Sequence, residues 1–248
     1  MAILVKYDLL VIGAGGTGTY FLKEVSRQIS CSIEIKKRLR NLMIIDGDTV
    51  EEKNLERQCF APEDIGRNKA VCMANILNDA FGLNWVSYAT YLEKKEQLQE
   101  LLPTHKDKRV ATAYDPVILP VIIGCVDNHA CRILCEQFFN EAHSCIYFDS
   151  ANEFSNGETV FAYKMGGKLI GPPRSSFFPE IKDGDLRSVT EMSCEELNHV
   201  VPQHIYTNMF AGLNLCSGFN NLMHESMHPG VAFFNPQRFT MEFVPYAG

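Results

Sequence analysis

The chain has 248 residues, 46% of them hydrophobic, and a net charge of −7 with a sequence pI of about 5.5. This length and apolar content suffice for a sizeable core. The acidic balance argues against nucleic-acid or membrane-surface partners, because these favour basic patches. No apolar run reaches the roughly 18 residues that a membrane span needs, and the N-terminus lacks a signal-peptide pattern. We therefore expect a soluble cytoplasmic protein.

Strand and helix patterns alternate up to about residue 150. Residues 7–18 predict a strand, a glycine-rich turn and the start of a helix. Further strands are expected at 42–45, 85–91, 120–124 and 145–148, and helices at 67–81, 93–102 and 129–142. The basic stretch 30–40 is expected to be a solvated connection, and 104–116 an exposed loop.

The pattern changes after residue 150. Antiparallel strands are predicted at 159–164 and 239–244, a proline-rich irregular segment lies between them, and a helix is expected at 203–223. The whole order predicts an α/β fold with a doubly wound, mostly parallel sheet and an antiparallel extension in its C-terminal part. We expect a single domain over residues 1–248, with halves at 1–150 and 151–248.

A glycine-rich loop follows the first predicted strand. Gly13, Gly15 and Gly18 form G-x-G-x-x-G, with Gly16 between them. Such a loop turns tightly, lets backbone approach a phosphate, and leads into a helix whose free N–H groups attract anions. The motif expects an acidic residue about 20 positions on. Asp46 lies farther away, which an insertion at 30–40 would explain. The alternative is that these glycines only allow the tight turn and bind no ligand.

The stretch from Ile44 to Lys69 holds charges suited to a nucleotide. Asp46 ends the second predicted strand and can hold ribose hydroxyls, whereas Arg57 and Lys69 can hold phosphates. A dehydrogenase does not need these two cations, so they favour a triphosphate. Asp127 ends the fourth predicted strand, where a carboxylate can bind Mg²⁺ together with substrate phosphates.

These residues make the chain resemble the ThiF/MoeB/HesA family of adenylyltransferases, which is related to ubiquitin-activating enzymes. The resemblance covers about residues 7–163 and includes the pattern D-x-D-x-V-x-x-x-N-L-x-R-Q, then G-x-x-K, then C-x-D-N. The matching residues are Gly13, Gly15, Gly18, Asp46, Asp48, Val50, Asn54, Leu55, Arg57, Gln58, Gly66, Lys69, Cys125, Asp127 and Asn128. So many ordered positions are far more specific than the glycine motif alone.

The resemblance implies a Rossmann-like fold, a homodimer and activation of a small ubiquitin-fold protein that ends in Gly-Gly. The substrate's C-terminal carboxylate would attack the α-phosphate of ATP and release pyrophosphate. Asp46 would bind ribose, Asn54, Arg57 and Lys69 the phosphates, and Asp127 the Mg²⁺. Gln58 would orient Arg57. Asp48 and Asn128 match the nucleotide-binding motif.

Several of these residues have simpler interpretations. Asp48 and Asn54 are residue types that cap turns. Arg57 and Lys69 could be surface cations. Asp127 could cap the helix predicted from residue 129, because Asp favours that position.

The chain departs from well-known relatives in three ways. It has nine scattered cysteines and no C-x-x-C pair, so we expect no structural zinc and mostly reduced core thiols. The family's N-terminal helix, which sends an arginine into the partner's site, is missing, and Arg27 and Arg174 are candidate replacements. Cys194 is the candidate nucleophilic cysteine, although its acidic neighbours would raise its pKa and a structural role is equally open. Ser193, Cys194 and a later Asn208 resemble the plasmid-borne ThiF-type proteins of the PRTRC system.

Three other functions remain open. The carboxylate could belong to a small molecule or to a tRNA, although the acidic balance disfavours tRNA. A nicotinamide-dependent oxidoreductase would bind NAD and not ATP. A non-catalytic scaffold would bind ATP without exchanging pyrophosphate.

Overall fold

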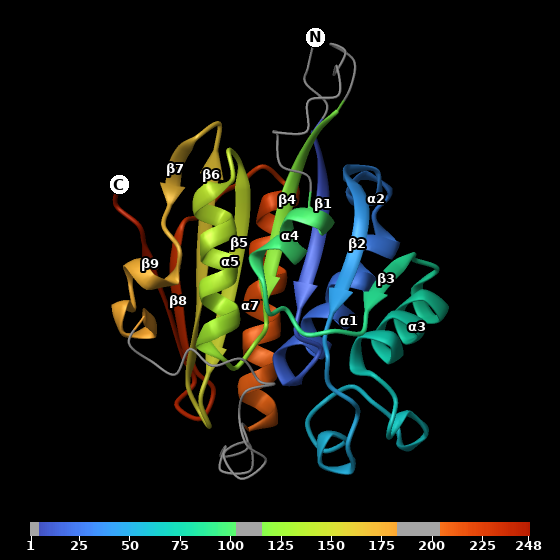
Figure 1. Cartoon of the computed structure of the whole chain (residues 1–248). Coiled ribbons are helices and arrows are strands. Elements are labelled where there is room, and N and C mark those ends of the chain that lie inside the picture. Colours follow the sequence, from blue (N-terminus) through green and yellow to red (C-terminus); the bar gives the residue numbers. More distant parts are fainter. Residues whose placement is uncertain (1–4, 103–115, 183–203) are drawn as a thin grey trace.

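The computed structural model describes residues 5–102, 116–182 and 204–248. Within them, nine strands form one sheet in the order β3-β2-β1-β4-β5-β6-β8-β9, with β7 paired to β6 (Figure 1). The strands are β1 (Val5–Ile12), β2 (Leu39–Ile45), β3 (Trp85–Tyr88), β4 (Val117–Gly124), β5 (Cys145–Asn152), β6 (Gly157–Met165), β7 (Lys168–Gly171), β8 (Gly230–Asn235) and β9 (Thr240–Pro245). The helices are α1 (Gly16–Cys31), α2 (Ile33–Arg38), α3 (Lys69–Phe81), α4 (Lys95–Leu101), α5 (His129–Glu141) and α7 (Ile205–Met223).

The first five strands are parallel and the last four are antiparallel. β1 and β4 are buried through most of their length because helices cover both faces of the sheet. This confirms the predicted doubly wound, mostly parallel sheet with an antiparallel C-terminal extension. The order 3-2-1-4-5 reverses direction between β1 and β4, which is the point where open α/β sheets bind ligands.

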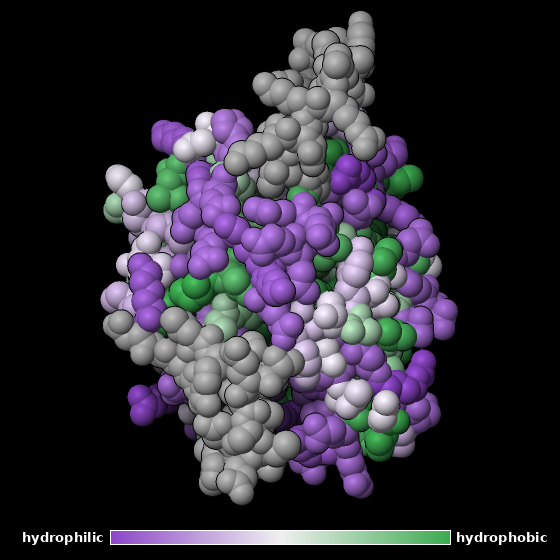
Figure 2. Space-filling model, viewed as in Figure 1, coloured by the Kyte–Doolittle hydropathy of each residue, from purple (hydrophilic) through white to green (hydrophobic). Residues whose placement is uncertain are grey.

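Two apolar cores lie on opposite faces of the sheet. One face is covered by α1, α3 and α7, and its core includes Phe21, Leu77 and Phe219. The other is covered by α4 and α5, and its core includes Leu98 and Phe138. Seen from the second face, hydrophilic residues dominate the surface where α4 lies (Figure 2). None of the helices described here has the length and apolarity needed to cross a membrane.

Two expectations about secondary structure were wrong. The stretch 30–40 is not a connection, because α1 runs to Cys31 and α2 follows, capped by the Ser32 side chain, which accepts from the Ile35 N–H. Its solvent exposure was expected, since α2 buries only Ile35. The antiparallel part also contains two unpredicted strands, β7 and β8. The predicted loop 104–116 lies almost wholly outside the described residues.

Candidate functional site

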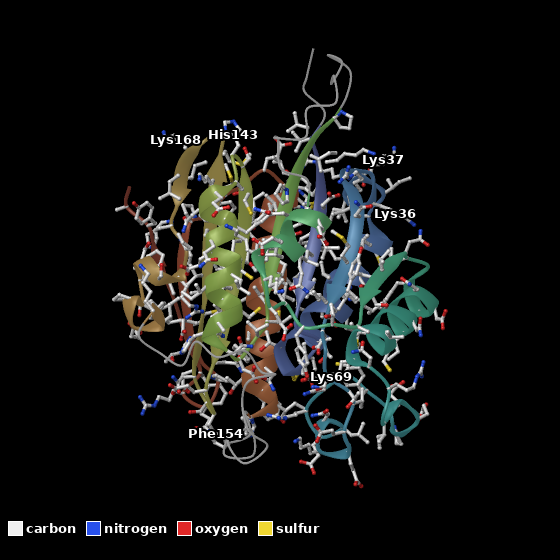
Figure 3. All side chains as sticks on the ribbon, in the orientation of Figure 1. Lys36, Lys37, Lys69, His143, Phe154 and Lys168 are labelled. Atoms are coloured by element: carbon white, nitrogen blue, oxygen red, sulfur yellow. The ribbon has the colours of Figure 1, made fainter. Side chains whose placement is uncertain are left out.

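A cavity of about 1700 Å³ opens at the carboxyl ends of the parallel strands, where the strand order reverses between β1 and β4. Its walls come from the glycine loop, the loop after β2, residues 90–94, residues 125–134, the end of β5 and residues within 174–181. Figure 3 shows Lys69 and Phe154 at this end of the molecule, whereas Lys36, Lys37 and Lys168 lie at the opposite end. The basic stretch 30–40 therefore contributes no charge to the cavity.

The glycine loop is built for close contact with its neighbours. Gly13 has φ +92°, and a Cβ there would lie 2.7 Å from the Cys125 carbonyl oxygen. A Cβ on Gly18 would overlap the Gly13 carbonyl oxygen, so neither position has room for a side chain. Gly15 and Gly16 line the cavity directly. The loop thus brings backbone N–H groups at the start of α1 to the cavity wall.

Asp46 is held at the end of β2 by two backbone donors. Its Oδ2 accepts from the Ala14 N–H at 2.6 Å, and its Oδ1 accepts from the Asp48 N–H at 2.8 Å. Burial, and then the neighbouring Asp48 charge, raise the pKa of Asp46 to about 6, against the opposing effect of Lys69. The carboxyl therefore lies between the glycine loop and the cavity, with its charge state open to change near neutral pH.

Asp48 pairs with two residues of the same wall. Its Oδ2 lies 2.9 Å from the Lys69 Nζ, and its Oδ1 accepts from the Tyr91 hydroxyl at 2.6 Å. Burial opposes ionisation, but Lys69 and Tyr91 hold the pKa of Asp48 below its ordinary value. Lys69 is only 6% exposed, so it is not a surface cation. Tyr91, whose ring lies against Gly47, was missed because no motif marked it.

Arg57 also lines the cavity. Its half-buried side chain makes no hydrogen bond or ion pair with any residue that the structure describes. The neighbouring Gln58 is buried, and its Oε1 has no partner within the described residues. The predicted orientation of Arg57 is therefore not made through this oxygen. A cation that lacks a counter-ion inside a cavity suits an anionic ligand.

The simpler interpretation is correct for Asn54. Its side chain is 3% exposed, and its Oδ1 accepts from the Glu51 N–H at 2.9 Å, which caps the short turn Glu52–Asn54. Asn54 still lines the cavity. Contact with a phosphate remains a prediction.

Asn128, rather than Asp127, caps α5. Its Oδ1 accepts from the Cys131 N–H at 2.8 Å, so the suggestion that Asp127 is the cap was wrong. Asp127 is exposed to the cavity and has no hydrogen bond or ion pair within the described part of the chain. Its carboxylate is therefore available to a cation.

A buried charge cluster lies beneath the Asp127 loop. Asp149 is 1% exposed and pairs with Arg132 at 3.3 Å and with Arg174, which also pairs with Glu158. Burial opposes ionisation of Asp149, but the two guanidinium groups hold its pKa below the ordinary value. Arg132 also donates to the Val126 carbonyl, next to Asp127. The cluster thus ties the Asp127 loop to the end of β5.

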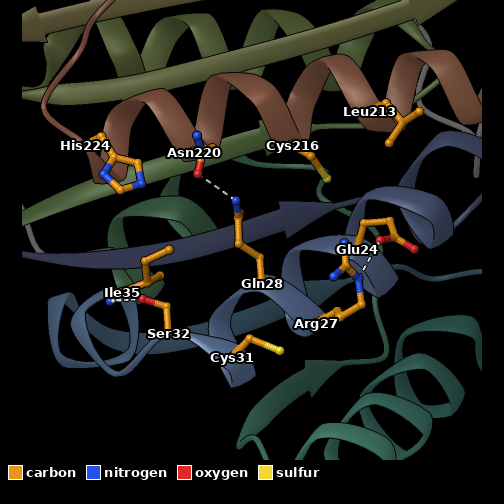
Figure 4. Close-up of a pocket in the computed structure, with 10 residues that line it drawn as sticks. All are labelled: Glu24, Arg27, Gln28, Cys31, Ser32, Ile35, Leu213, Cys216, Asn220 and His224. Carbon is orange, nitrogen blue, oxygen red and sulfur yellow. Dashed lines mark hydrogen bonds and ion pairs between the residues drawn. The ribbon is translucent and has the colours of Figure 1, made fainter.

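This cluster corrects one expectation. Arg174 is 3% exposed and fully engaged with Asp149 and Glu158, so it is not available to enter a partner's site. Arg27 lies in a different place, in a cavity of about 430 Å³ between α1 and α7 (Figure 4). It is exposed and pairs with Glu24 at 3.0 Å. Arg27 remains a candidate for a role between subunits.

Eight of the nine cysteines lie in the part of the chain that the structure describes. They are free thiols, and burial raises the pKa of Cys216 to about 12 and also raises the pKa of Cys125. Within the same residues, no group of three or more His, Cys, Asp or Glu side chains could hold a metal ion. Cys194 lies outside the described residues, so its proposed role remains a prediction.

The strand order and the glycine loop at the switch point define a Rossmann-like α/β protein. Residues 2–203 match the ThiF family, and the chain therefore belongs to that family. This confirms the resemblance seen in the sequence motifs.

Curated relatives match shorter stretches. The chain is 40% identical over 74 residues to the Nedd8-activating enzyme E1 catalytic subunit of Drosophila melanogaster, which is 29% of this chain and 14% of the relative. It is 27% identical over 139 residues to ubiquitin-like modifier-activating enzyme 5 of Oryza sativa subsp. japonica, covering 54% of this chain and 30% of the relative. The chain thus spans less than a third of these relatives.

Solved structures share the fold over 96% of this chain. E. coli MccB with ATP has a TM-score of 0.64 at 14% identity, and PaaA has 0.63 at 14%. The matches cover 63% and 64% of those chains.

Proposed function

We propose that this protein uses ATP and Mg²⁺ to adenylate the C-terminal carboxylate of a small ubiquitin-fold protein and releases pyrophosphate. One observation carries the proposal. A single cavity is lined by the glycine loop, Asp46, Lys69, and by Arg57 and Asp127, whose side chains have no polar partner among the described residues. These groups match the parts of one nucleotide triphosphate: ribose, phosphates and a phosphate-bound cation.

The residues present can perform the chemistry of the reaction. A carboxylate oxygen of the substrate forms a new bond to the α-phosphorus of ATP. The bond between the α-phosphorus and the oxygen that bridges it to the β-phosphorus breaks, and that oxygen leaves with the electron pair as part of pyrophosphate. No proton has to be removed, so the site needs no general base. Arg57 and Lys69 would neutralise charge on the pyrophosphate, and one such donor typically contributes about 2.7–4 kcal/mol. As ATP binds, the Lys69 ammonium would leave its ion pair with Asp48 and pair with a phosphate oxygen instead.

The donor set also fits magnesium. Mg²⁺ is usually bound through one or two carboxylates together with substrate phosphates and water. Asp127 supplies one carboxylate that faces the cavity. The residues present would therefore hold the ion mainly against the nucleotide, where it would offset phosphate charge during the attack.

The substrate class rests on relatives and on the resemblance. Two curated relatives carry names that describe activation of Nedd8 or of a ubiquitin-like modifier. We extend the proposal to a partner ending in Gly-Gly, to a homodimer and to a cytoplasmic location. Sedimentation of the purified chain tests the dimer, and a monomer at working concentrations would contradict it.

The decisive assay is ATP–pyrophosphate exchange with a ubiquitin-fold protein that ends in Gly-Gly. We expect exchange that depends on the partner's free C-terminal carboxylate and on Mg²⁺. A partner with an amidated C-terminus is the matched control and should give none. Exchange that survives Asp127→Ala would refute the magnesium assignment, and ATP binding without exchange, with any partner, would favour a scaffold.

A further inference from the structure

Asn208, near the start of α7, carries an unused donor in a buried position. The residue is 0% exposed, and its Nδ2 has no acceptor among the residues that the structure describes. A buried donor left unpaired costs about 1–3 kcal/mol. Such a group in a native structure requires an explanation, and a bound ligand is one.

The Asn208 amide lies against the first residue of α1. A Cβ built on Gly16 would stand 2.6 Å from the Asn208 Cγ and would overlap Nδ2. The bare Cα of Gly16 therefore makes room for the amide. Because Gly16 lines the large cavity, the donor lies just behind the cavity wall.

Two cavity-lining residues hold Asn208 in this orientation. Asn152 Nδ2 donates to the Asn208 Oδ1 at 2.7 Å, and the Thr17 hydroxyl donates to the Asn152 Oδ1 at 3.1 Å. The next residue back on α7, Thr207, donates through its hydroxyl to the Phe154 carbonyl at 2.9 Å. The oxygen of the Asn208 amide is thus engaged, and the nitrogen faces Gly16.

The N-terminus of α1 also lacks a side-chain acceptor for its first N–H groups within the described residues. Gly15 at its N-cap provides no side-chain hydrogen bond, and the first turn holds no acidic residue. By contrast, Asn68 and Asn128 cap α3 and α5 with their side chains. The positive end of the α1 dipole and its free N–H groups therefore face the cavity, and none of the described side chains caps them. One anionic oxygen would satisfy both this helix end and the Asn208 donor.

The position of Asp46 indicates which phosphate of the nucleotide would lie next to Gly16. This carboxyl accepts from Ala14, two residues before Gly16. If Asp46 holds the ribose, the phosphate joined directly to that ribose is the one that reaches Gly16. The β- and γ-phosphates would extend farther, toward Arg57 and Lys69.

We propose that Asn208 is a further nucleotide-binding residue, whose Nδ2–H donates to a non-bridging oxygen of the α-phosphoryl group at the N-terminus of α1. This rests on the proposed function, which assigns a nucleotide to the cavity. Asn152 and Thr17 act as positioning residues through the Asn208 oxygen. The α-phosphoryl group is the one attacked, so this donor acts where charge develops.

Calorimetry with AMP and adenosine at pH 8 tests the contact, because the two ligands differ only in the α-phosphoryl group. We expect wild-type protein to bind AMP more tightly than adenosine. Asn208→Ala should weaken AMP binding by about tenfold or more, since a hydrogen bond to a charged group contributes about 1.5–3 kcal/mol. Adenosine affinity should stay unchanged.

Two further variants separate binding from folding. Asn214 lies on the same helix, is 3% exposed and also has an Nδ2 without a partner among the described residues, but the three atoms nearest to a Cβ on the cavity-lining Gly16 all belong to Asn208. Asn214→Ala should therefore leave both affinities unchanged. Asn208→Asp keeps the shape but replaces the donor by a carboxylate, so it should weaken AMP binding more than alanine does and spare adenosine.

The inference is overturned if Asn208→Ala weakens AMP and adenosine by the same factor, or if it matches Asn214→Ala. Wild-type protein that binds neither ligand would instead overturn the proposed function, and the inference with it.

Discussion

Two groups of charged residues border the same cavity and differ in how they are paired. Beneath the cavity, Asp149 is enclosed by Arg132 and Arg174, and all three are at most 4% exposed. Inside it, Arg57 and Asp127 face open space with no partner in the described part of the chain. The first group is already neutralised within the protein and holds the backbone. The second group has charge left for a ligand. We therefore assign a structural role to the charged residues that are paired within the protein, here called the saturated group, and a binding role to those without a partner in the described part of the chain, the unsaturated group.

The largest effect should come from breaking the saturated group. Arg174→Ala leaves Asp149 and Glu158 without a main partner, and removing one member of a buried pair typically costs about 3–5 kcal/mol. Urea unfolding should show a loss of this size. Arg27→Ala is the matched control, because its exposed pair with Glu24 should contribute at most about 1 kcal/mol. Equal losses in the two variants would contradict the structural role of the cluster.

The unsaturated group should show the reverse pattern. Arg57→Ala removes no hydrogen bond or ion pair with the described residues, so the free energy of unfolding should change little. Pyrophosphate exchange should fall by about 10²–10³-fold, as when one donor to developing charge is lost. Lys53→Ala is the control in the same loop, since Lys53 also lines the cavity but is exposed and pairs with Glu51. A comparable fall in the Lys53→Ala variant would contradict a specific role for Arg57 in stabilising the phosphate charge.

Asp46 should make nucleoside binding sensitive to pH. Its pKa of about 6 means that the carboxyl becomes protonated below that pH and loses its charge as an acceptor. Adenosine affinity should therefore fall as pH drops through about 6, by roughly tenfold per unit well below it. Adenosine is the right probe because phosphate groups themselves titrate near pH 6. Asp46→Asn should flatten the profile, and a wild-type profile that is already flat would refute the assignment.

The same shift has a consequence for stability with the opposite sign. The folded protein binds the Asp46 proton more tightly than the unfolded chain does. Stability from this group is therefore present at acid pH and is lost as pH rises through about 6. Comparing urea unfolding of wild type and Asp46→Asn between pH 5 and 7 would detect it.

The smallest effect is expected at Tyr91. Tyr91→Phe removes one hydrogen bond to Asp48, which is worth about 0.5–1.5 kcal/mol. Denaturant unfolding should show a loss in this range, with ATP affinity changed by less than about tenfold. A loss of ATP binding as large as that of Arg57→Ala would place Tyr91 among the main binding residues.

The parallel half of the fold was predictable because its strands are continuous apolar runs separated by strong signals. Ile44 and Ile45 lead into Asp46, and the glycine loop follows β1. Gly13, Asp46, Lys69 and Asp127 line one cavity because the ends of parallel strands meet at one edge of the sheet. The antiparallel part was harder. β8 is a short apolar run beside Pro229 and Pro236, and α2 buries only one residue, so neither has a periodic pattern.

The pairing of charges could not be read from the sequence. Arg132 and Arg174 reach Asp149 from 17 and 25 residues away, and no motif relates these positions. For the same reason, Arg174 was interpreted as free and Asn208 was not linked to Gly16. Asn54 and Asn128 show a different limit. Asn is suited both to turns and to ligands, and only coordinates show which N–H each side chain accepts from.

The most direct test of the account is calorimetry with ATP and NAD on wild-type protein and Arg57→Ala, in the presence of Mg²⁺. We expect wild-type protein to bind ATP more tightly than NAD, and Arg57→Ala to weaken ATP binding by at least about tenfold while leaving adenosine binding unchanged. Tighter binding of NAD than of ATP, or an ATP affinity that Arg57→Ala does not alter, would contradict a cavity built around a triphosphate.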